Sequence, residues 1–186
     1  MINELEARAT KAGGSICVAY VFFRYSDAAD LTIRHVLEIL VKQTVERHPN
    51  CVSFAEQGYA RHLREDTQPT EAELFQLLQR FTQIHSATFY ILDALDEAPY
   101  KLQVALIKKL SMLNVRLFIT SRPLKAVEAQ IPDVHSFAIS AQDDDLDLHI
   151  TQEIGCSRDL QDLLESVDPS VREEIVSSIK QNCGGM

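Results

Sequence analysis

The sequence lacks any dense run of Lys or Arg, and its 27 acidic and 18 basic residues give a formal net charge of -9. Clustered cations supply most of the affinity for nucleic acids, so we expect no DNA or RNA partner. The longest unbroken apolar run, residues 16–23, is far shorter than the roughly 20 residues that cross a bilayer. We therefore expect no membrane-spanning segment and no membrane partner.

Two further features are missing. Residues 1–8, MINELEAR, carry acids where a signal peptide has a basic region and an apolar core, so we expect a cytoplasmic protein. The four cysteines are widely spaced, with no CxxC pair and no His at metal-finger spacing. The six histidines form no HExxH or other paired arrangement. We expect reduced thiols and assign no metal site to Cys or His.

What the sequence does contain is an alternation of apolar runs with amphipathic segments, in a chain long enough for one sizeable domain. This alternation predicts an α/β fold with a doubly wound parallel sheet, followed by a helical segment. Strands are predicted at 15–23, 87–92 and 115–120, with a weaker one at 134–140. Helices are predicted at 2–12, 30–48, 71–83, 100–113, 144–153, 157–166 and 169–182, with a weak one at 53–63.

The segment FYILDALDEAP, residues 89–99, runs from a buried strand into three carboxylates. Ligands of an open parallel sheet bind outside the carboxyl ends of its strands, where Asp93 stands. A carboxylate there can hold Mg²⁺, while Asp96 and Glu97 can hydrogen-bond a metal-bound water or orient an attacking one. The alternative is that these acids cap the helix that follows.

A second motif, TSRP at residues 120–123, follows the next predicted strand. If the two strands are neighbours, the hydroxyl of Thr120 and the guanidinium of Arg122 lie at the same edge as Asp93. Arg122 could then contact a terminal phosphate in a bidentate manner. The alternative is a turn arginine held in place before Pro123.

Residues 89–99 followed by VRLFITSRP, residues 115–123, resemble the Walker B and sensor 1 motifs of the NACHT domain of STAND-class P-loop NTPases, in particular the fungal NLR-like branch. Three further segments are similar to that family: VAYVFFRYSD at 18–27, SFAISAQDDDLDLHIT at 136–151 and IKQNCGGM at 179–186. The resemblance implies a P-loop NTPase-like core over residues 1–142 and the start of a helical subdomain over 143–186.

The resemblance also implies a role for each motif residue. Asp93 would be the Mg²⁺ ligand, Asp96 and Glu97 the extended acidic pair, and Glu97 the residue that orients the attacking water. Arg122, with Thr120 beside it, would read the γ-phosphate. Such domains switch between a closed ADP-bound form and an open ATP-bound form that oligomerises in signal transduction, and their slow hydrolysis resets the switch.

The Walker A motif of such a protein, G-x-x-x-x-G-K-[ST], is absent, because none of the six glycines precedes a Lys at that spacing. Residues 2–12 also have no N-terminal cap before Ile2. We therefore expect this helix to begin before Met1, with the P-loop and its strand upstream. This chain alone should bind ATP weakly or not at all, and whether it is an enzyme stays open. A missing strand would expose a sheet edge that favours self-association.

Two other functions remain open from the residues. One is a degenerate NACHT-like scaffold that binds proteins and no nucleotide. The other is an unrelated Mg²⁺-dependent phosphotransfer enzyme that uses Asp93 as nucleophile or metal ligand. Such enzymes gather acids from two strand ends, and Asp27 is the residue that could join Asp93.

Overall fold

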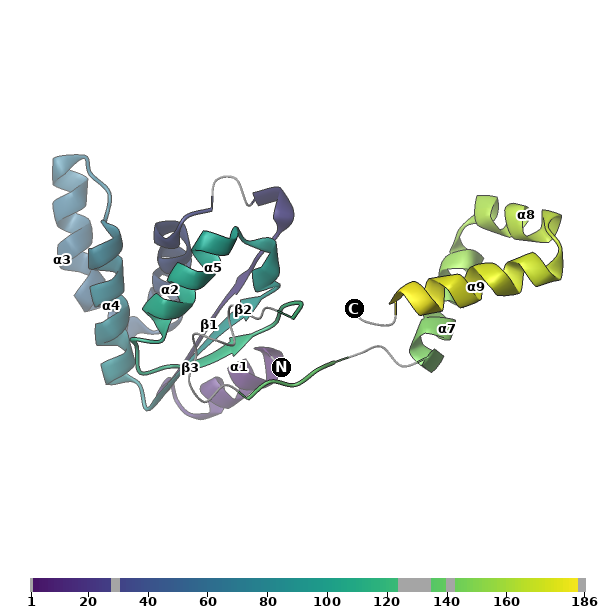
Figure 1. Ribbon diagram of the computed structural model, residues 1–186. Coiled ribbons are helices and arrows are strands. Elements are labelled where there is room, and N and C mark those ends of the chain that lie inside the picture. The colour runs from purple at the N-terminus through teal and green to yellow at the C-terminus, as the bar shows by residue number, and fades with distance from the viewer. Residues whose placement is uncertain (1, 28–30, 124–134, 140–142, 184–186) are drawn as a thin grey trace. The chain divides into compact units, whose positions relative to one another are not determined.

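The computed structural model describes residues 2–27, 31–123, 135–139 and 143–183, and divides the chain into two compact units, Met1–Val134 and His135–Met186 (Figure 1). The first unit is an α/β structure, and the second contains helices.

The first unit is built on a parallel sheet of three strands in the order β1-β2-β3. The strands are β1 (Ile16–Phe22), β2 (Ala87–Asp93) and β3 (Arg116–Ile119). In the register, Ile16 lies opposite Ala87 and Phe89 lies opposite Arg116. Residues 88–92 of the central strand β2 are all buried, which is what a continuous apolar run in a parallel sheet predicts.

One face of the sheet is covered by helix α1 (Ile2–Lys11) (Figure 1). Its residues Ile2, Leu5 and Ala9 pack against a cluster formed by Val18, Phe89 and Ile91. The helix ends at Gly13 and Gly14, whose φ angles of 62° and 82° lie in the left-handed region that favours glycine. The chain thereby turns directly from α1 into β1.

The opposite face carries α2 (Ile33–Arg47), α4 (Glu71–Ile84) and α5 (Tyr100–Leu110), while α3 (Pro49–Glu65) packs against α2 and α4 (Figure 1). This larger core includes the fully buried side chains Leu37, Leu40, Leu78, Phe81 and Leu106. Helices on both faces of a parallel sheet confirm the predicted α/β fold class.

Helix ends follow the local sequence. The side chain of Thr32 accepts a hydrogen bond from the backbone of His35 and begins α2. Thr70 and Glu73 form the predicted capping box of α4, in which each side chain bonds the other's backbone N–H. By contrast, α3 is much longer than the weak helix predicted over 53–63. It begins earlier, with Pro49 in its first turn, and only a narrow stripe around Cys51 and Phe54 faces the core, so the apolar periodicity that would have predicted it is weak.

The second unit contains α7 (Asp143–Cys156), α8 (Arg158–Ser166) and α9 (Pro169–Cys183), close to the helices predicted there. Residues 135–139, part of the predicted fourth strand, form no strand, and Phe137 and Ile139 in this stretch are exposed. Residues 134 and 140 lie outside the described part of the chain. Where side chains of this unit are described, none is fully buried.

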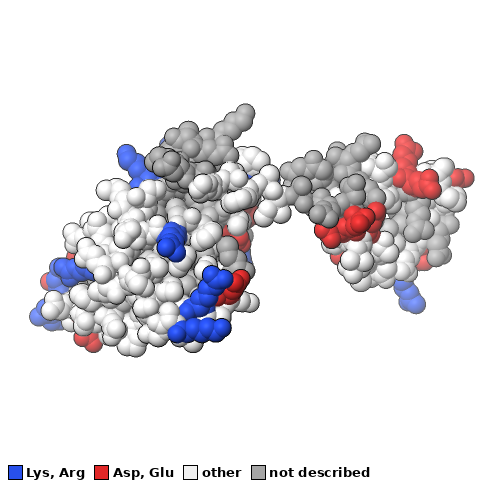
Figure 2. Space-filling model, turned by 90° about the horizontal axis from the view of Figure 1, so that it is seen from below, with Lys and Arg blue, Asp and Glu red and all other residues white. Residues whose placement is uncertain are grey.

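None of the helices in the described ranges is both long and apolar enough to cross a bilayer. On the face shown in Figure 2, the Lys and Arg side chains of the first unit lie singly or in small groups, and several of them adjoin acidic side chains. On the second unit in this view, acidic side chains are more frequent than basic ones. Neither unit presents a continuous basic patch on this face.

Candidate functional site

The carboxyl end of β2 is a tight turn that leads into a short 3₁₀ helix, η2 (Leu95–Glu97). Ala94 makes the turn in the left-handed region, with φ 54° and ψ 46°. Leu95 is completely buried and anchors the segment in the core. The side chain of the buried Gln103 donates a hydrogen bond to the carbonyl of Ala98 at 2.7 Å and holds the end of η2 in place.

Thr120 joins the ends of β2 and β3. Its hydroxyl donates to Oδ1 of Asp93 at 2.5 Å and accepts from the N–H of Ala94 at 2.9 Å. The carbonyl of Thr120 accepts the N–H of Leu95 at 3.0 Å. Because the hydroxyl is engaged as donor and as acceptor, the carboxylate of Asp93 has a defined orientation at the sheet edge.

Arg122 contacts Asp96 at two points. Its backbone N–H donates to Oδ1 of Asp96 at 3.3 Å, and its Nε lies 3.3 Å from Oδ2. The side chain of Asp96 is only 15% exposed, whereas that of Arg122 is 74% exposed. The acid is therefore fixed within the edge, and the guanidinium lies on its solvent side.

Glu97 reaches toward the end of β1. Its Oε2 accepts the backbone N–H of Tyr25 at 2.6 Å, at the start of the 3₁₀ helix η1 (Tyr25–Asp27). Sequence reasoning missed Tyr25, and no signal could have revealed it, because its contact uses the backbone and is independent of residue type. The side chain of Asp27, the second acid of the phosphotransfer alternative, lies outside the described part of the structure.

The five residues singled out in the sequence thus lie at one edge of the sheet and are linked across neighbouring strands. They are Asp93, Asp96, Glu97, Thr120 and Arg122. The three carboxylates are half-buried, and one guanidinium accompanies them, so the formal charge of the set is negative. Carboxylate oxygens are ligands that suit a hard divalent cation such as Mg²⁺, but the three acids do not converge as a set on one point in the described structure, so a single carboxylate would be the ligand.

The acids do not cap the helix that follows. Helix α5 has Pro99 at its N-cap, no side-chain cap hydrogen bond and no acid in its first turn. Asp96 and Glu97 instead accept hydrogen bonds from Arg122 and Tyr25, which follow other strands. The geometry therefore disfavours helix capping as the reason for these acids.

Comparison with known proteins gave one result that bears on this edge. The family model described as "Nephrocystin 3, N-terminal" matches residues 1–122, which include β1, β2, β3 and all five residues of the edge. Neither the curated proteins nor the solved structures gave a significant match. The matched segment is well over half of the 186 residues, and the chain therefore belongs to the nephrocystin 3 N-terminal family.

Proposed function

We propose that this chain carries the Walker B and sensor 1 side of a NACHT-type nucleotide-dependent signalling switch, whose ligands are Mg²⁺ and ATP or ADP. The observation that carries the proposal is the pair of cross-strand links Asp93–Thr120 and Asp96–Arg122. They join the two motifs that resemble Walker B and sensor 1 at the edge where ligands of parallel sheets bind.

In this proposal each residue of the edge has a separate role. Asp93, oriented by Thr120, would ligate Mg²⁺, which neutralises charge on the phosphates. Glu97 would hold the attacking water. Arg122 would exchange its contact with Asp96 for one with the γ-phosphate, since its exposed guanidinium suits bidentate phosphate binding.

The proposal assigns the phosphate cradle to sequence outside these 186 residues, because they contain no Walker A motif. The backbone amides and the lysine of that motif make most of the phosphate contacts, so we expect this chain alone to bind nucleotide weakly or not at all. Calorimetric titration of the chain with Mg-ATP tests this point. A dissociation constant in the low micromolar range would contradict it.

The role of Glu97 is tested in the full-length parent protein. Glu97→Gln should slow ATP turnover while it leaves nucleotide binding unchanged, because the amide keeps the shape but cannot act as a base. Glu56→Gln on α3 is a matched control at an exposed position. Unchanged turnover in Glu97→Gln would remove this residue from the mechanism.

The second candidate is an interaction scaffold that keeps the fold and the acidic edge but binds no nucleotide. It is favoured by the missing Walker A motif and by the way Asp93, Asp96 and Glu97 already have partners within the protein. The gene sequence upstream of Met1 separates the two candidates. A glycine-rich GKT or GKS motif there supports the switch, and its absence supports the scaffold.

Self-association is proposed through the outer edge of β3. Among the described residues no strand pairs with that edge. Phe118 on this strand is 39% exposed. An unpaired strand edge with an apolar side chain can pair with a second copy of the chain. Light scattering across a concentration series should show association that Phe118→Lys weakens, and a monomer at every concentration would contradict this part of the proposal.

A further inference from the structure

At the opposite, amino end of the strands, a thiol and two imidazoles converge from three separate elements. Cys17 is the second residue of β1, His48 joins α2 to α3, and His85 follows α4 directly before β2. One ligand atom from each, the Sγ of Cys17 and a ring nitrogen of each histidine, lie within 4.8 Å of one another. The two imidazole rings meet edge to face, with their centroids 4.5 Å apart.

All three side chains are withdrawn from solvent. Cys17 is fully buried, and His48 and His85 are 8% and 9% exposed. Tetrahedral ligands at about 2.0 to 2.3 Å from a zinc ion are about 3.3 to 3.6 Å apart. A contraction of about 1 Å would therefore bring this set to bonding distance, which is within the reach of side-chain rotation.

Each histidine is already oriented by a contact to the backbone. Nδ1 of His85 lies 2.6 Å from the carbonyl of Phe81 and must donate to it, so Nε2 carries the free lone pair. His48 is hydrogen-bonded to the backbone of Gly14, which lies on its Nδ1 side. A backbone carbonyl that fixes one ring nitrogen while the other binds the ion is the usual arrangement around metal-ligating histidines.

The Sγ of Cys17 makes one weak hydrogen-bond contact, with the hydroxyl of Thr44. The hydroxyl of Thr44 donates to the carbonyl of Leu40 at 2.8 Å, so at 3.6 Å from Sγ it serves as acceptor of the thiol proton. Metal binding would replace only this weak contact. The nearby cation Arg47 is paired with Glu6 at 3.1 Å, which lessens its repulsion of a bound ion.

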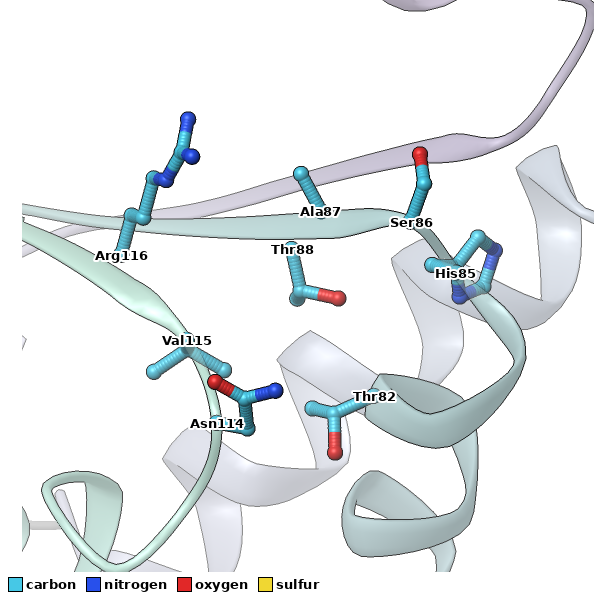
Figure 3. A pocket seen from close by; sticks show the side chains of 8 residues that line it. All are labelled: Thr82, His85, Ser86, Ala87, Thr88, Asn114, Val115 and Arg116. Atoms are coloured by element: carbon cyan, nitrogen blue, oxygen red, sulfur yellow. The ribbon is translucent and has the colours of Figure 1, made fainter.

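A space that can hold water lies beside His85. This cavity of about 130 Å³ is lined by His85, Thr88, Thr82 and Asn114, among others, but by neither Cys17 nor His48, so a water there would reach the ion from the His85 side. Thr88 is 3% exposed, and its hydroxyl has no hydrogen-bond partner within the described protein. Figure 3 shows this hydroxyl pointing into the space on the His85 side of the cavity. Thr88 is also the register partner of Cys17 on the neighbouring strand.

We propose that Cys17, His48 and His85 bind a borderline-soft divalent transition metal, with Zn²⁺ as the best fit and water as the fourth ligand. One thiolate and two neutral imidazoles form a donor set that suits zinc and does not suit Mg²⁺. The site lies at the end of the strands opposite to the carboxylate edge and is independent of the nucleotide proposal. Because the ligands come from three elements, the ion would tie α2, α4 and β1 together.

Cobalt is the probe for this site, because Co²⁺ replaces Zn²⁺ and absorbs light. The full chain, stripped with chelator and kept reduced, is titrated with Co²⁺. We expect one equivalent to produce a thiolate-to-cobalt charge-transfer band and tetrahedral ligand-field bands, both displaced by Zn²⁺. Cys17→Ser should abolish the charge-transfer band, and His85→Asn should weaken binding at least about tenfold.

Control variants exclude trivial explanations. His35→Gln removes an exposed imidazole and Cys51→Ser removes another buried thiol, and both should keep the wild-type spectrum. Far-ultraviolet circular dichroism shows whether each variant is folded. Absence of one-equivalent binding in the wild type, or a charge-transfer band that survives in Cys17→Ser, would overturn the proposal.

Discussion

Thr120 donates a hydrogen bond to Asp93 across the ends of two neighbouring parallel strands, and the same hydroxyl accepts the N–H of Ala94. One side chain thereby connects the acidic turn after β2 to the end of β3. The carbonyl of Thr120 also accepts the N–H of Leu95, so the hydroxyl and the carbonyl of this residue both bond the acidic turn.

Thr120→Val is expected to lower the free energy of unfolding by about 1 kcal/mol, because the isosteric side chain removes both hydrogen bonds of the hydroxyl, to Asp93 and from the N–H of Ala94, at an exposed position. Thr120→Ser keeps the hydroxyl and is the matched control. Urea denaturation of both variants measures the difference. Equal stability of the valine and serine variants would show that the hydroxyl contributes nothing.

Ala94→Gly is expected to stabilise the protein by about 1 kcal/mol. Ala94 has a φ of 54°, and an L-residue in this left-handed region loses about 1 to 2 kcal/mol that glycine does not lose. Ala94→Val, which adds a β-branch in the same conformation, should destabilise. Thermal unfolding followed by circular dichroism gives both values, and a glycine variant that is less stable than wild type would contradict the expected strain.

Tyr90→Phe is expected to leave the free energy of unfolding unchanged or to raise it slightly. Tyr90 is fully buried, and its hydroxyl has no partner among the described residues. Burial raises the pKa of this phenol, so the group is neutral at all moderate pH values. Removal of an unpaired buried hydroxyl can be neutral or favourable. A loss of more than about 1 kcal/mol in urea denaturation would instead indicate a hidden partner.

Glu73 should make stability depend on pH in acid. Hydrogen bonds from the backbone and side chain of Thr70, and then the nearby Arg61, lower the pKa of Glu73 from 4.5 to about 2. Between these values the unfolded chain binds more protons than the folded one. The contribution of Glu73 is therefore complete above about pH 4.5 and is lost as pH falls toward 2.

Glu73→Gln tests this dependence. The stability difference between wild type and variant should shrink steadily as the pH of urea denaturation is lowered from about 4.5 toward 2. The glutamine can keep part of the capping box, so a difference at neutral pH reflects mainly the charge. A difference that stays constant over this pH range would mean that the Glu73 carboxylate is not stabilised in the fold.

The elements best predicted from sequence are those set by local chemistry. The spacing of Thr70 and Glu73 predicts the capping box of α4. The continuous apolar run of β2 predicts a buried strand without knowledge of the tertiary structure. The extent of α3 was underestimated, because a helix with a narrow apolar stripe shows weak periodicity. The strand predicted around Phe137 is wrong over residues 135–139, since alternating apolar residues form a strand only where a partner strand is available.

The candidate site could be predicted in part. The motifs placed Asp93 and Arg122 at one edge, because parallel neighbours bring their carboxyl ends together. The Asp96–Arg122 contact and the bond from the Tyr25 backbone depend on loop conformation. The cluster around Cys17 left no signal, because its three members are more than 30 residues apart and share no motif. Spacing along the sequence alone predicts no metal site at Cys or His.

The two strand pairs of the sheet also differ in the length of chain that must close before each pair can form. Partners in β2 and β3 are 27 residues apart along the chain, whereas partners in β1 and β2 are 71 apart. Closing the longer loop costs about 1 kcal/mol more entropy. The βαβ unit β2–α5–β3, which contains the acidic turn, can thus assemble before β1 pairs with β2. The turn that carries Asp93 and Asp96 can then take shape with β2 and β3 alone, whereas the contact of Glu97 with the Tyr25 backbone forms only once β1 is in place.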